Sequence, residues 1–179
     1  LPDINYQQEV RVIMEDFEGN YYYNGDGLEI FNYSSDTQTY EASVNFTDLS
    51  SGDYNLLIKG PTHRQMRFCQ DGNQPLDHVC RRSENISLNA GETHGFDFST
   101  DYLDAGDVDW QNGVNTLDWS AILGCRDADA RMGDNGAYIC FESDACENCK
   151  YADINFDGNV NNFDIDLLYK TLSSSPDDE

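Results

Sequence analysis

Short runs of alternating hydrophobic and polar residues fill the first hundred positions of the chain. These runs are rich in aromatic and β-branched residues, and clusters of Gly, Asn, Asp and Ser separate them. This combination is typical of β-strands joined by turns. The expected strands are 9–17, 28–31, 40–46, 54–59, 66–68, 86–88 and 96–98. Seven short strands over about a hundred residues predict an immunoglobulin-like or fibronectin-like β-sandwich over residues 1–103.

The pattern changes after residue 103. Two apolar runs, 119–123 and 165–172, predict short helices, and each directly follows an acidic segment. We therefore expect a mainly β chain with a small α module over residues 104–172. Residues 173–179 are an acidic C-terminal tail.

The segment 153–164 has oxygen-bearing side chains at the positions used by an EF-hand-type calcium loop. Such a loop offers side-chain oxygens from positions 1, 3, 5, 9 and 12 and a carbonyl from position 7, with a sharp turn at a glycine in position 6. Gly158 stands at position 6, and Val160 at position 8 is expected to point inward. The predicted ligands of this second loop are Asp153, Asn155, Asp157, Asn159 through its carbonyl, Asn161 and Asp164.

The same pattern occurs 46 positions earlier, beginning at Asp107 instead of Asp153. The predicted ligands of this first loop (107–118) are Asp107, Asp109, Gln111, Gly113 through its carbonyl, Asn115 and Asp118. Gln111 is neutral, and Asn112 replaces the usual glycine, although Asn tolerates the left-handed conformation better than most residues. Val114 repeats the inward-pointing anchor. We expect two Ca²⁺ sites, the first weaker than the second.

The two loops begin Gly106-Asp-Val-Asp and Ala152-Asp-Ile-Asn, and each ends in Asp before an apolar helix. In these features the chain resembles a type I dockerin over about residues 104–172. The segment 98–106 also lacks a helical pattern, as does the approach to each loop in that family. The resemblance implies a small calcium-dependent module that binds another protein, the cohesin domain of cellulosomes and related assemblies.

Two features depart from the dockerin pattern. Dockerin repeats normally lie closer together than 46 positions, and here a cysteine-rich insert fills the gap. The partner-recognition positions of the family, 10 and 11 of each loop, hold Thr116-Leu117 and Asn162-Phe163. Because these pairs differ, a symmetric binding mode is not implied. Calcium binding carries over better than cohesin binding.

The composition is strongly acidic, with 34 acidic against 10 basic residues and a formal net charge of −24 over 179 residues. This balance argues against binding to nucleic acid or anionic membranes, which need clustered Lys and Arg. No run approaches the roughly 18 apolar residues of a membrane span, so we expect no membrane insertion. Residues 1–4 have neither a basic start nor an apolar stretch, and we expect that any export signal has been removed.

Six cysteines fall into two groups, with an even number in each. Local disulfides and an oxidising compartment are the favoured interpretation, which predicts an extracellular or cell-surface location. Zinc is the alternative for the second group because Cys146 and Cys149 form a Cys-x-x-Cys, and a redox role is disfavoured because no βαβ pattern surrounds it. The groups are Cys69 and Cys80, then Cys125, Cys140, Cys146 and Cys149.

Two further patterns concern sugars. Asn32, Asn45 and Asn85 each begin an Asn-x-Ser/Thr sequon and are candidate glycosylation sites. The run 21–23 consists of three tyrosines, whose flat faces would suit sugar rings. Consecutive strand residues point to opposite faces, so at most two of the three rings share one side.

The sequence has none of the common catalytic motifs. His63, His78 and His94 have no Ser or Cys motif beside them, and there is no nucleophile elbow, phosphate-binding glycine loop or zinc-protease motif. The best Asp clusters already have a calcium explanation, and a loop with every position filled is a structural site. We predict that the chain is not an enzyme.

Two functions remain. The first is a calcium-stabilised subunit of a secreted or cell-surface fibre, in which an N-terminal arm (1–6) adds a strand to the sheet edge of the next copy. The alternative is a dockerin module joined to a carbohydrate-binding β-sandwich in a cellulosome-like complex. The predicted partner is accordingly either a second copy of the chain or a cohesin-like domain.

Overall fold

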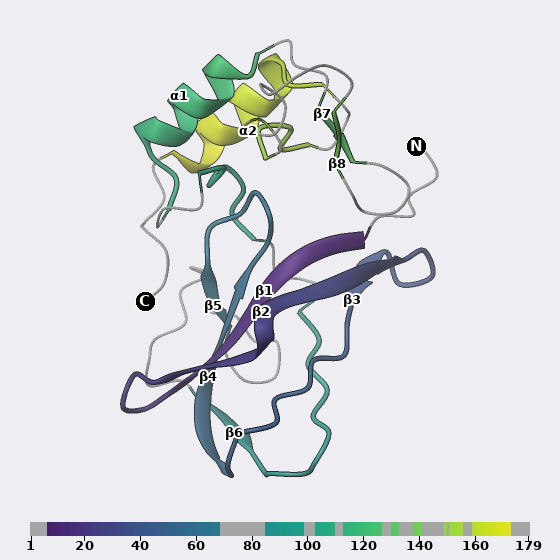
Figure 1. Cartoon of the computed structure of the whole chain (residues 1–179), viewed down its shortest axis with the longest axis vertical. Helices are drawn as coiled ribbons and strands as arrows, with labels where there is room; N and C mark the ends of the chain where they lie inside the picture. Colours follow the sequence, from purple (N-terminus) through teal and green to yellow (C-terminus); the bar gives the residue numbers. More distant parts are fainter. Residues whose placement is uncertain are drawn as a thin grey trace.

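The computed structural model describes residues 7–68, 85–98, 103–109, 113–126, 130–132, 138–140, 149, 151–155 and 159–172. The chain is mainly β, as predicted: an antiparallel sheet is followed by two short helices (Figure 1). The sheet consists of β1 (Gln7–Asp16), β2 (Tyr21–Ser34), β3 (Thr39–Glu41), β4 (Gly52–Lys59), β5 (Met66–Phe68) and β6 (Ile86–Leu88). Its strand order is β3-β2-β1-β4-β5, and β6 also pairs with β4.

The sheet curls because β2 carries extra residues opposite β1. Arg11 pairs with Leu28 whereas Ile13 pairs with Tyr23, so two steps along β1 correspond to five along β2. Gly25 and Gly27 lie in this bulge with φ of 52° and 85°, values that glycine adopts without strain. A bulge of this kind bends its strand and increases the local twist, which gives the sheet the form of a half-barrel.

One face of the sheet builds the hydrophobic core of the N-terminal part. Alternate residues of β1 and β4, including Val10, Val12 and Leu56, are buried there. Irregular segments cover this face. They contribute the partly buried side chains Val44, Phe46, Leu49, Phe96, Phe98 and Leu103.

The predicted sandwich requires two packed sheets, and the strands of residues 7–98 that the structure describes form one. The segments 42–46 and 96–98, expected to be strands, are irregular, although Phe96 and Phe98 still pack into the core. The aromatic pattern therefore identified the core residues correctly but overestimated how regular their backbone is. Conversely, the predicted strand 28–31 is part of the longer β2, which already begins at Tyr21.

The opposite face of the sheet is also buried at its centre, where polar residues flank the apolar pair Ile13 and Leu57. Glu15 pairs with Asn55 across β1 and β4, and the two residues are 0% and 1% exposed. The Arg67 guanidinium donates to the Glu15 carboxylate at 3.2 Å. Buried charges are tolerated when they are paired, so this face combines a buried ion pair with apolar side chains.

The C-terminal part contains α1 (Thr116–Gly124), the hairpin β7 (Ala130–Met132) with β8 (Tyr138–Cys140), and α2 (Asn162–Thr171). The helices lie side by side at the end of the molecule away from β6 (Figure 1). They share a small core that includes Ile122, Ile154 and Leu168. No helix of the described residues is long and apolar enough to cross a membrane.

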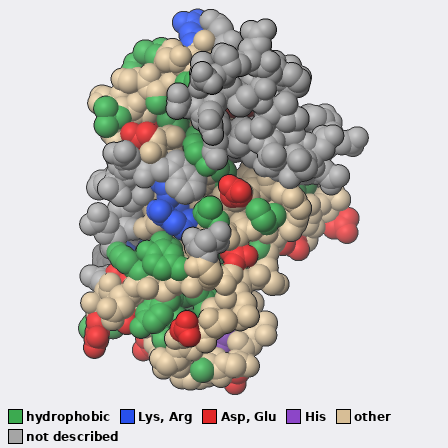
Figure 2. Space-filling model, in the orientation of Figure 1, with side chains coloured by type: hydrophobic (Ala, Val, Ile, Leu, Met, Phe, Trp, Pro, Cys, Tyr) green, Lys and Arg blue, Asp and Glu red, His purple; other side chains and the backbone are tan. Residues whose placement is uncertain are grey.

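Acidic side chains on the face seen in Figure 2 are scattered over the sheet part, between hydrophobic ones, instead of gathering in one place. Among the described residues, one group of three carboxylates lies close enough together to hold a metal ion, and it belongs to the first loop.

Candidate metal centre

Three carboxylates of the first loop converge in the folded chain. Oxygen atoms of Asp107, Asp109 and Asp118 all lie within 4.8 Å of one another. Asp107 and Asp118 are 0% exposed. Three negative charges at this separation repel one another strongly in a buried site, and carboxylate oxygens are the preferred ligands of hard divalent cations. The cluster could therefore hold a metal ion.

Asp118 is placed by the start of α1. Asn115 is the N-cap residue, and the Asp118 carboxylate accepts the Asn115 backbone N–H at 2.8 Å to complete a capping box. Its other oxygen accepts the N–H groups of Val108 and Asp109 at 2.8 and 3.2 Å. Burial nevertheless raises the pKa of Asp118, with a smaller contribution from the Asp109 charge, against the opposing effect of these hydrogen bonds. A bound cation would favour the ionised form that burial disfavours.

Asp107 has a buried oxygen without a protein partner. Its Oδ1 atom makes no hydrogen bond, whereas Oδ2 accepts the Gly113 N–H at 3.4 Å and contacts the ammonium of Lys59. A buried acceptor left unsatisfied costs about 1–3 kcal/mol. An ion coordinated by Oδ1 would remove that cost, so the donor set of the first loop fits a hard divalent cation.

The second loop repeats the hydrogen bonds of the first, 46 residues later. Asp164 accepts N–H groups from Ile154, Asn155 and Asn161 at 2.8, 3.2 and 2.8 Å, the same distances as in the first loop. Asn161 caps α2 and Asp164 completes its capping box. Asp153 and Asp164 are 1% and 0% exposed. The predicted duplication is thus present in the backbone geometry as well as in the sequence.

The remaining predicted ligands divide into two groups. Gln111 and Asp157 lie outside the described residues. The others are described and lie in the loops: Gly113, Asn115, Asn155, Asn159 and Asn161. The amides of Asn115 and Asn161 donate to the carbonyls of Gly113 and Asn159 at 3.1 and 3.2 Å. A carbonyl oxygen has two lone pairs, so the bond from Asn115 leaves room for a metal at the Gly113 carbonyl, position 7 of the first loop.

The two position-8 anchors point inward, as expected. Val114 is 6% exposed and Val160 0%, and both belong to the core shared by the helices. Gly106 lies just before the first loop with φ of 124°, and a β-carbon there would meet Leu168 Cδ1 at 2.9 Å. Thr171 of α2 also donates to the Ala105 carbonyl. The C-terminal end of α2 therefore packs against residues 105–106, which directly precede the first loop.

One disulfide joins the two repeats. Cys125, at the end of α1, is bonded to Cys149, and their Cα atoms are 5.4 Å apart. This bond confirms a local disulfide in the cysteine-rich insert, and the sulfur of Cys149 is bonded to Cys125 rather than being a free thiolate ligand for zinc. Cys69, Cys80 and Cys146 lie outside the described residues, as does the Cys140 side chain.

Sequence reasoning missed the residues that connect the sheet to the first loop. The turn 60–63 after β4 lies against the linker 104–106: Gly106 N–H donates to the Thr62 carbonyl at 2.6 Å, and His63 forms an antiparallel bridge with Ala105. Lys59, immediately before this turn, reaches Asp107. A lysine at the end of a strand looks solvent-exposed in sequence, and no local pattern could have indicated an aspartate 48 positions away.

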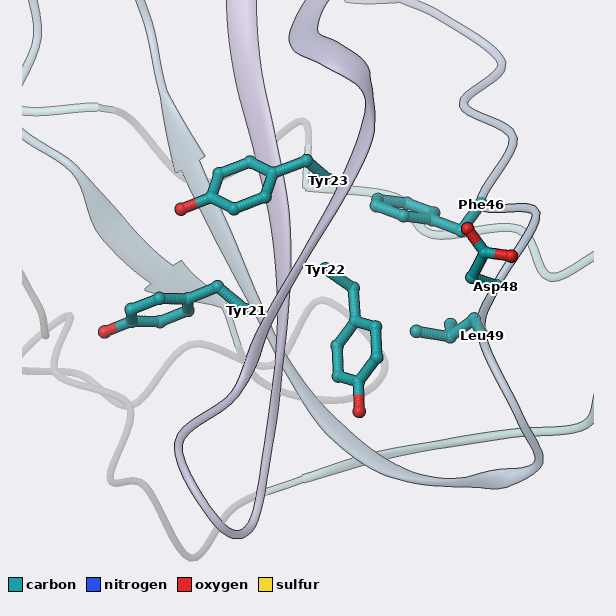
Figure 3. Close-up of a pocket in the computed structure, with 6 residues that line it drawn as sticks. All are labelled: Tyr21, Tyr22, Tyr23, Phe46, Asp48 and Leu49. Carbon is teal, nitrogen blue, oxygen red and sulfur yellow. The ribbon is translucent and has the colours of Figure 1, made fainter.

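Several large apolar side chains of the described residues are exposed, and two pairs of them bear on the predicted binding sites. Leu117 and Phe163, at position 11 of the two loops, are 60% and 67% exposed. Tyr21 and Tyr23 point to one side of β2, whereas Tyr22 points to the other, toward Leu49 (Figure 3). The three tyrosines line a shallow cavity of about 230 Å³ together with Phe46, Asp48 and Leu49. Two of the three rings thus share a face, as the alternation predicted.

The sequons and histidines are dispersed. Asn32 and Asn45 are exposed, whereas Asn85 is half-buried. Asn32 accepts a hydrogen bond from the Gln7 amide at 2.9 Å. His63 lies in the turn after β4, and His94 accepts the Asn89 N–H at 3.3 Å. His78 lies outside the described residues, as do the arm 1–6 and the tail 173–179.

Comparison of the chain with protein-family models and with curated proteins found no match. No family is therefore identified. The duplicated loops share one geometry. Each is followed by a helix whose N-terminus has a capping box formed by an N-cap Asn and an Asp three residues later.

Proposed function

We propose that this chain is a non-catalytic, calcium-stabilised extracellular protein that acts through protein–protein contacts. The observation that carries the proposal is the buried Asp107, Asp109 and Asp118 cluster, in which Asp107 Oδ1 has no protein partner. An unpartnered buried carboxylate oxygen beside two further carboxylates is expected where the fold was selected with a cation present.

Calcium fits the donor set better than other common metals. The loop positions offer carboxylates, amide oxygens and carbonyls, without a histidine or thiolate, which excludes the usual sites of zinc and copper. Ca²⁺ accepts six to eight oxygens in flexible geometry, whereas Mg²⁺ requires a near-octahedral set and retains several waters. The matching bonds to Asp118 and Asp164 support one site in each loop.

The disulfide between Cys125 and Cys149 is consistent with an oxidising compartment. Millimolar calcium is typical of such surroundings, where sites of modest affinity are filled. A protein held together in this way is stable outside the cell and weakened wherever calcium is withdrawn, which suits a structural role.

Assembly into a fibre is the finer part of the proposal. Over Tyr21–Tyr23, β2 pairs with β1 and with no second strand of the described residues, so this short edge presents backbone donors and acceptors. An extended segment can add to such an edge. We propose that residues 1–6 of a neighbouring copy occupy it, and that calcium binding reduces the repulsion between chains that each carry a charge of −24.

The alternative is recognition of a cohesin-like domain. It is favoured by the exposure of Leu117 and Phe163, because large apolar side chains at the start of both helices serve no core. In this alternative the exposed pair Tyr21 and Tyr23 would stack on a polysaccharide. Filaments in electron micrographs of the purified chain support the fibre, and their loss on deletion of 1–6 identifies the connector. Dispersed monomers that bind a cohesin or cellulose support the alternative.

The calcium proposal is tested by calorimetric titration and thermal melting. We expect two bound Ca²⁺ per chain and a melting temperature that falls in excess chelator, because ligand at a hundredfold its dissociation constant contributes about 2.7 kcal/mol per site. Asp118→Asn should abolish one of the two sites. The exposed Asp166→Asn on α2 is the matched control and should leave both. A melting curve that chelator does not move, with no bound calcium, contradicts the proposal.

A further inference from the structure

Lys59 is the most deeply buried cation of the described residues. It ends β4, its side chain is 0% exposed, and its ammonium donates to the His63 carbonyl at 3.0 Å. The same ammonium contacts Oδ2 of Asp107. A buried lysine is tolerated only when its charge is paired, so Asp107 is needed by the sheet as well as by the first loop.

Asp107 thus offers its two oxygens in two directions. Oδ2 is taken by Lys59 and, more weakly, by the Gly113 N–H at 3.4 Å, while Oδ1 has no protein partner. One carboxylate can bridge two cations in this way because each of its oxygens has its own lone pairs. The ammonium fixes the orientation in which Oδ1 remains available.

The charges of the first loop balance only when Lys59 is included. Asp107, Asp109 and Asp118 contribute −3, and position 5 is the neutral Gln111. With the ammonium of Lys59 the cluster carries −2, which a divalent ion neutralises. Since the site is buried, an uncompensated charge there would be costly.

We propose that Lys59 is a built-in part of the first metal site: it positions Asp107, sets the charge of the site for a divalent ion, and couples ion binding to the β-sheet. This inference rests on the proposed function of the first loop as a calcium site. Lys59 does not touch the ion in this arrangement; it acts through Asp107 and is a positioning residue.

The backbone around Lys59 supplies the path for that coupling. Gly106, the residue before Asp107, donates to the Thr62 carbonyl at 2.6 Å, and Arg64 donates to the Asp104 carbonyl at 2.7 Å. The Arg64 guanidinium also pairs with the Asp104 carboxylate at 3.1 Å. One side of this contact, 104–106, directly precedes the metal loop, and the other, 62–64, follows Lys59 at the end of β4. An ion that immobilises Asp107 therefore also restrains the turn 60–63 and the end of β4.

The first experiment compares the affinities for Ca²⁺ and Tb³⁺, ions of similar size and different charge. It is done by titration calorimetry on the full chain with Asp164→Asn, which removes the second loop's position-12 carboxylate. Adding Lys59→Met leaves the site with −3, so the affinity ratio of Tb³⁺ to Ca²⁺ should rise by roughly tenfold or more. Lys170→Met, at an exposed position of α2, removes the same formal charge and should leave the ratio unchanged.

A ratio that changes no more in Lys59→Met than in Lys170→Met overturns the inference. Absence of any binding that depends on Asp118 overturns the calcium site itself, and with it the role of Lys59. The two failures are therefore distinguishable.

If Lys59→Met does not fold, hydrogen exchange on chains that retain Lys59 tests the same coupling. Calcium should slow exchange in the turn 60–63 and the last residues of β4, both in the natural chain and with Asp164→Asn, and Asp118→Asn should abolish this effect. Protection confined to the first loop, without any change in β4 or the turn, overturns the coupling.

Discussion

The two loops have the same internal hydrogen bonds and different surroundings. Asp118 and Asp164 accept the same three N–H groups at the same distances, and each belongs to the capping box of its helix. The first loop, however, is joined to the sheet through Lys59 and the turn 60–63. Its position 5 is the neutral Gln111, whereas the second loop has Asp157 there. The two loops thus share their backbone hydrogen bonds, and the first combines a neutral residue at position 5 with an ionic contact to the sheet.

The largest expected effect comes from removing the position-12 carboxylates. Asp118→Ala and Asp164→Ala should each destabilise the chain by about 3 kcal/mol or more in calcium, because each loses a capping box, buried hydrogen bonds and an ion ligand. Asp164→Ala should cost more in calcium, since the second loop has the more complete donor set. In chelator the two variants should converge, because their remaining bonds match.

Urea unfolding with and without calcium measures this difference. The exposed Asp166→Ala controls for loss of a charge from α2 and should be nearly neutral. If Asp118→Ala costs more than Asp164→Ala in calcium, the assumed ranking of the two sites is wrong.

The anchors Val114 and Val160 test whether the two repeats share one core. Each valine loses two methyl groups on change to alanine, which should cost about 2 kcal/mol at a fully buried site. Val160 is 0% exposed and Val114 6%, so we expect the cost to be slightly larger at Val160. Unfolding of both variants in saturating calcium gives the comparison, and costs below about 0.5 kcal/mol would show that the anchors are not packed.

Acid should weaken the junction beside the first loop. Burial, followed by the positive charge of Lys59, lowers the pKa of His63 to about 4, although the Asp104 carboxylate opposes the shift. His63 therefore takes up a proton near pH 6.5 in the unfolded chain but only near pH 4 in the folded chain. The contribution of His63 to the free energy of unfolding is fully present above pH 6.5 and is lost as the pH falls toward 4. Because the ring is only partly buried, we expect this loss to be about 2 kcal/mol.

Stability measured at several pH values between 4 and 7 in natural chain and His63→Gln isolates this contribution. The variant should lose the part of the slope that His63 supplies and keep the part due to carboxylates elsewhere. Identical slopes in the two proteins would contradict the assignment to His63.

The smallest effect on stability is expected at the exposed position-11 residues. Leu117→Ala and Phe163→Ala should change the free energy of unfolding by no more than about 0.5 kcal/mol, because neither side chain fills the core. If the helices recognise a cohesin-like partner, these same changes should weaken binding. Calorimetric titration of the double variant with a cohesin separates the two roles, and a large loss of stability would show that the residues are structural.

Local signals in the sequence predicted much of this molecule. The loop positions, the anchors at Val114 and Val160 and the short helices all depend on residues within about twelve positions of one another. The alternation in β1 and β4 located core residues such as Val12 and Leu56. What could not be predicted depends on long-range packing: that Phe96 and Phe98 reach the core from an irregular segment, and that Lys59 turns inward to Asp107.

The bond between Cys125 and Cys149 has a consequence for engineering. Cys125 and Cys149 are 24 positions apart in sequence, yet their Cα atoms are 5.4 Å apart. The segment between them therefore begins and ends at nearly the same point. Segments whose two ends lie close together are good positions for insertions and replacements. A short linker in place of 126–148 would bring the two repeats close to the spacing of a compact tandem, and a foreign peptide inserted there would be displayed from a base that the cystine holds closed.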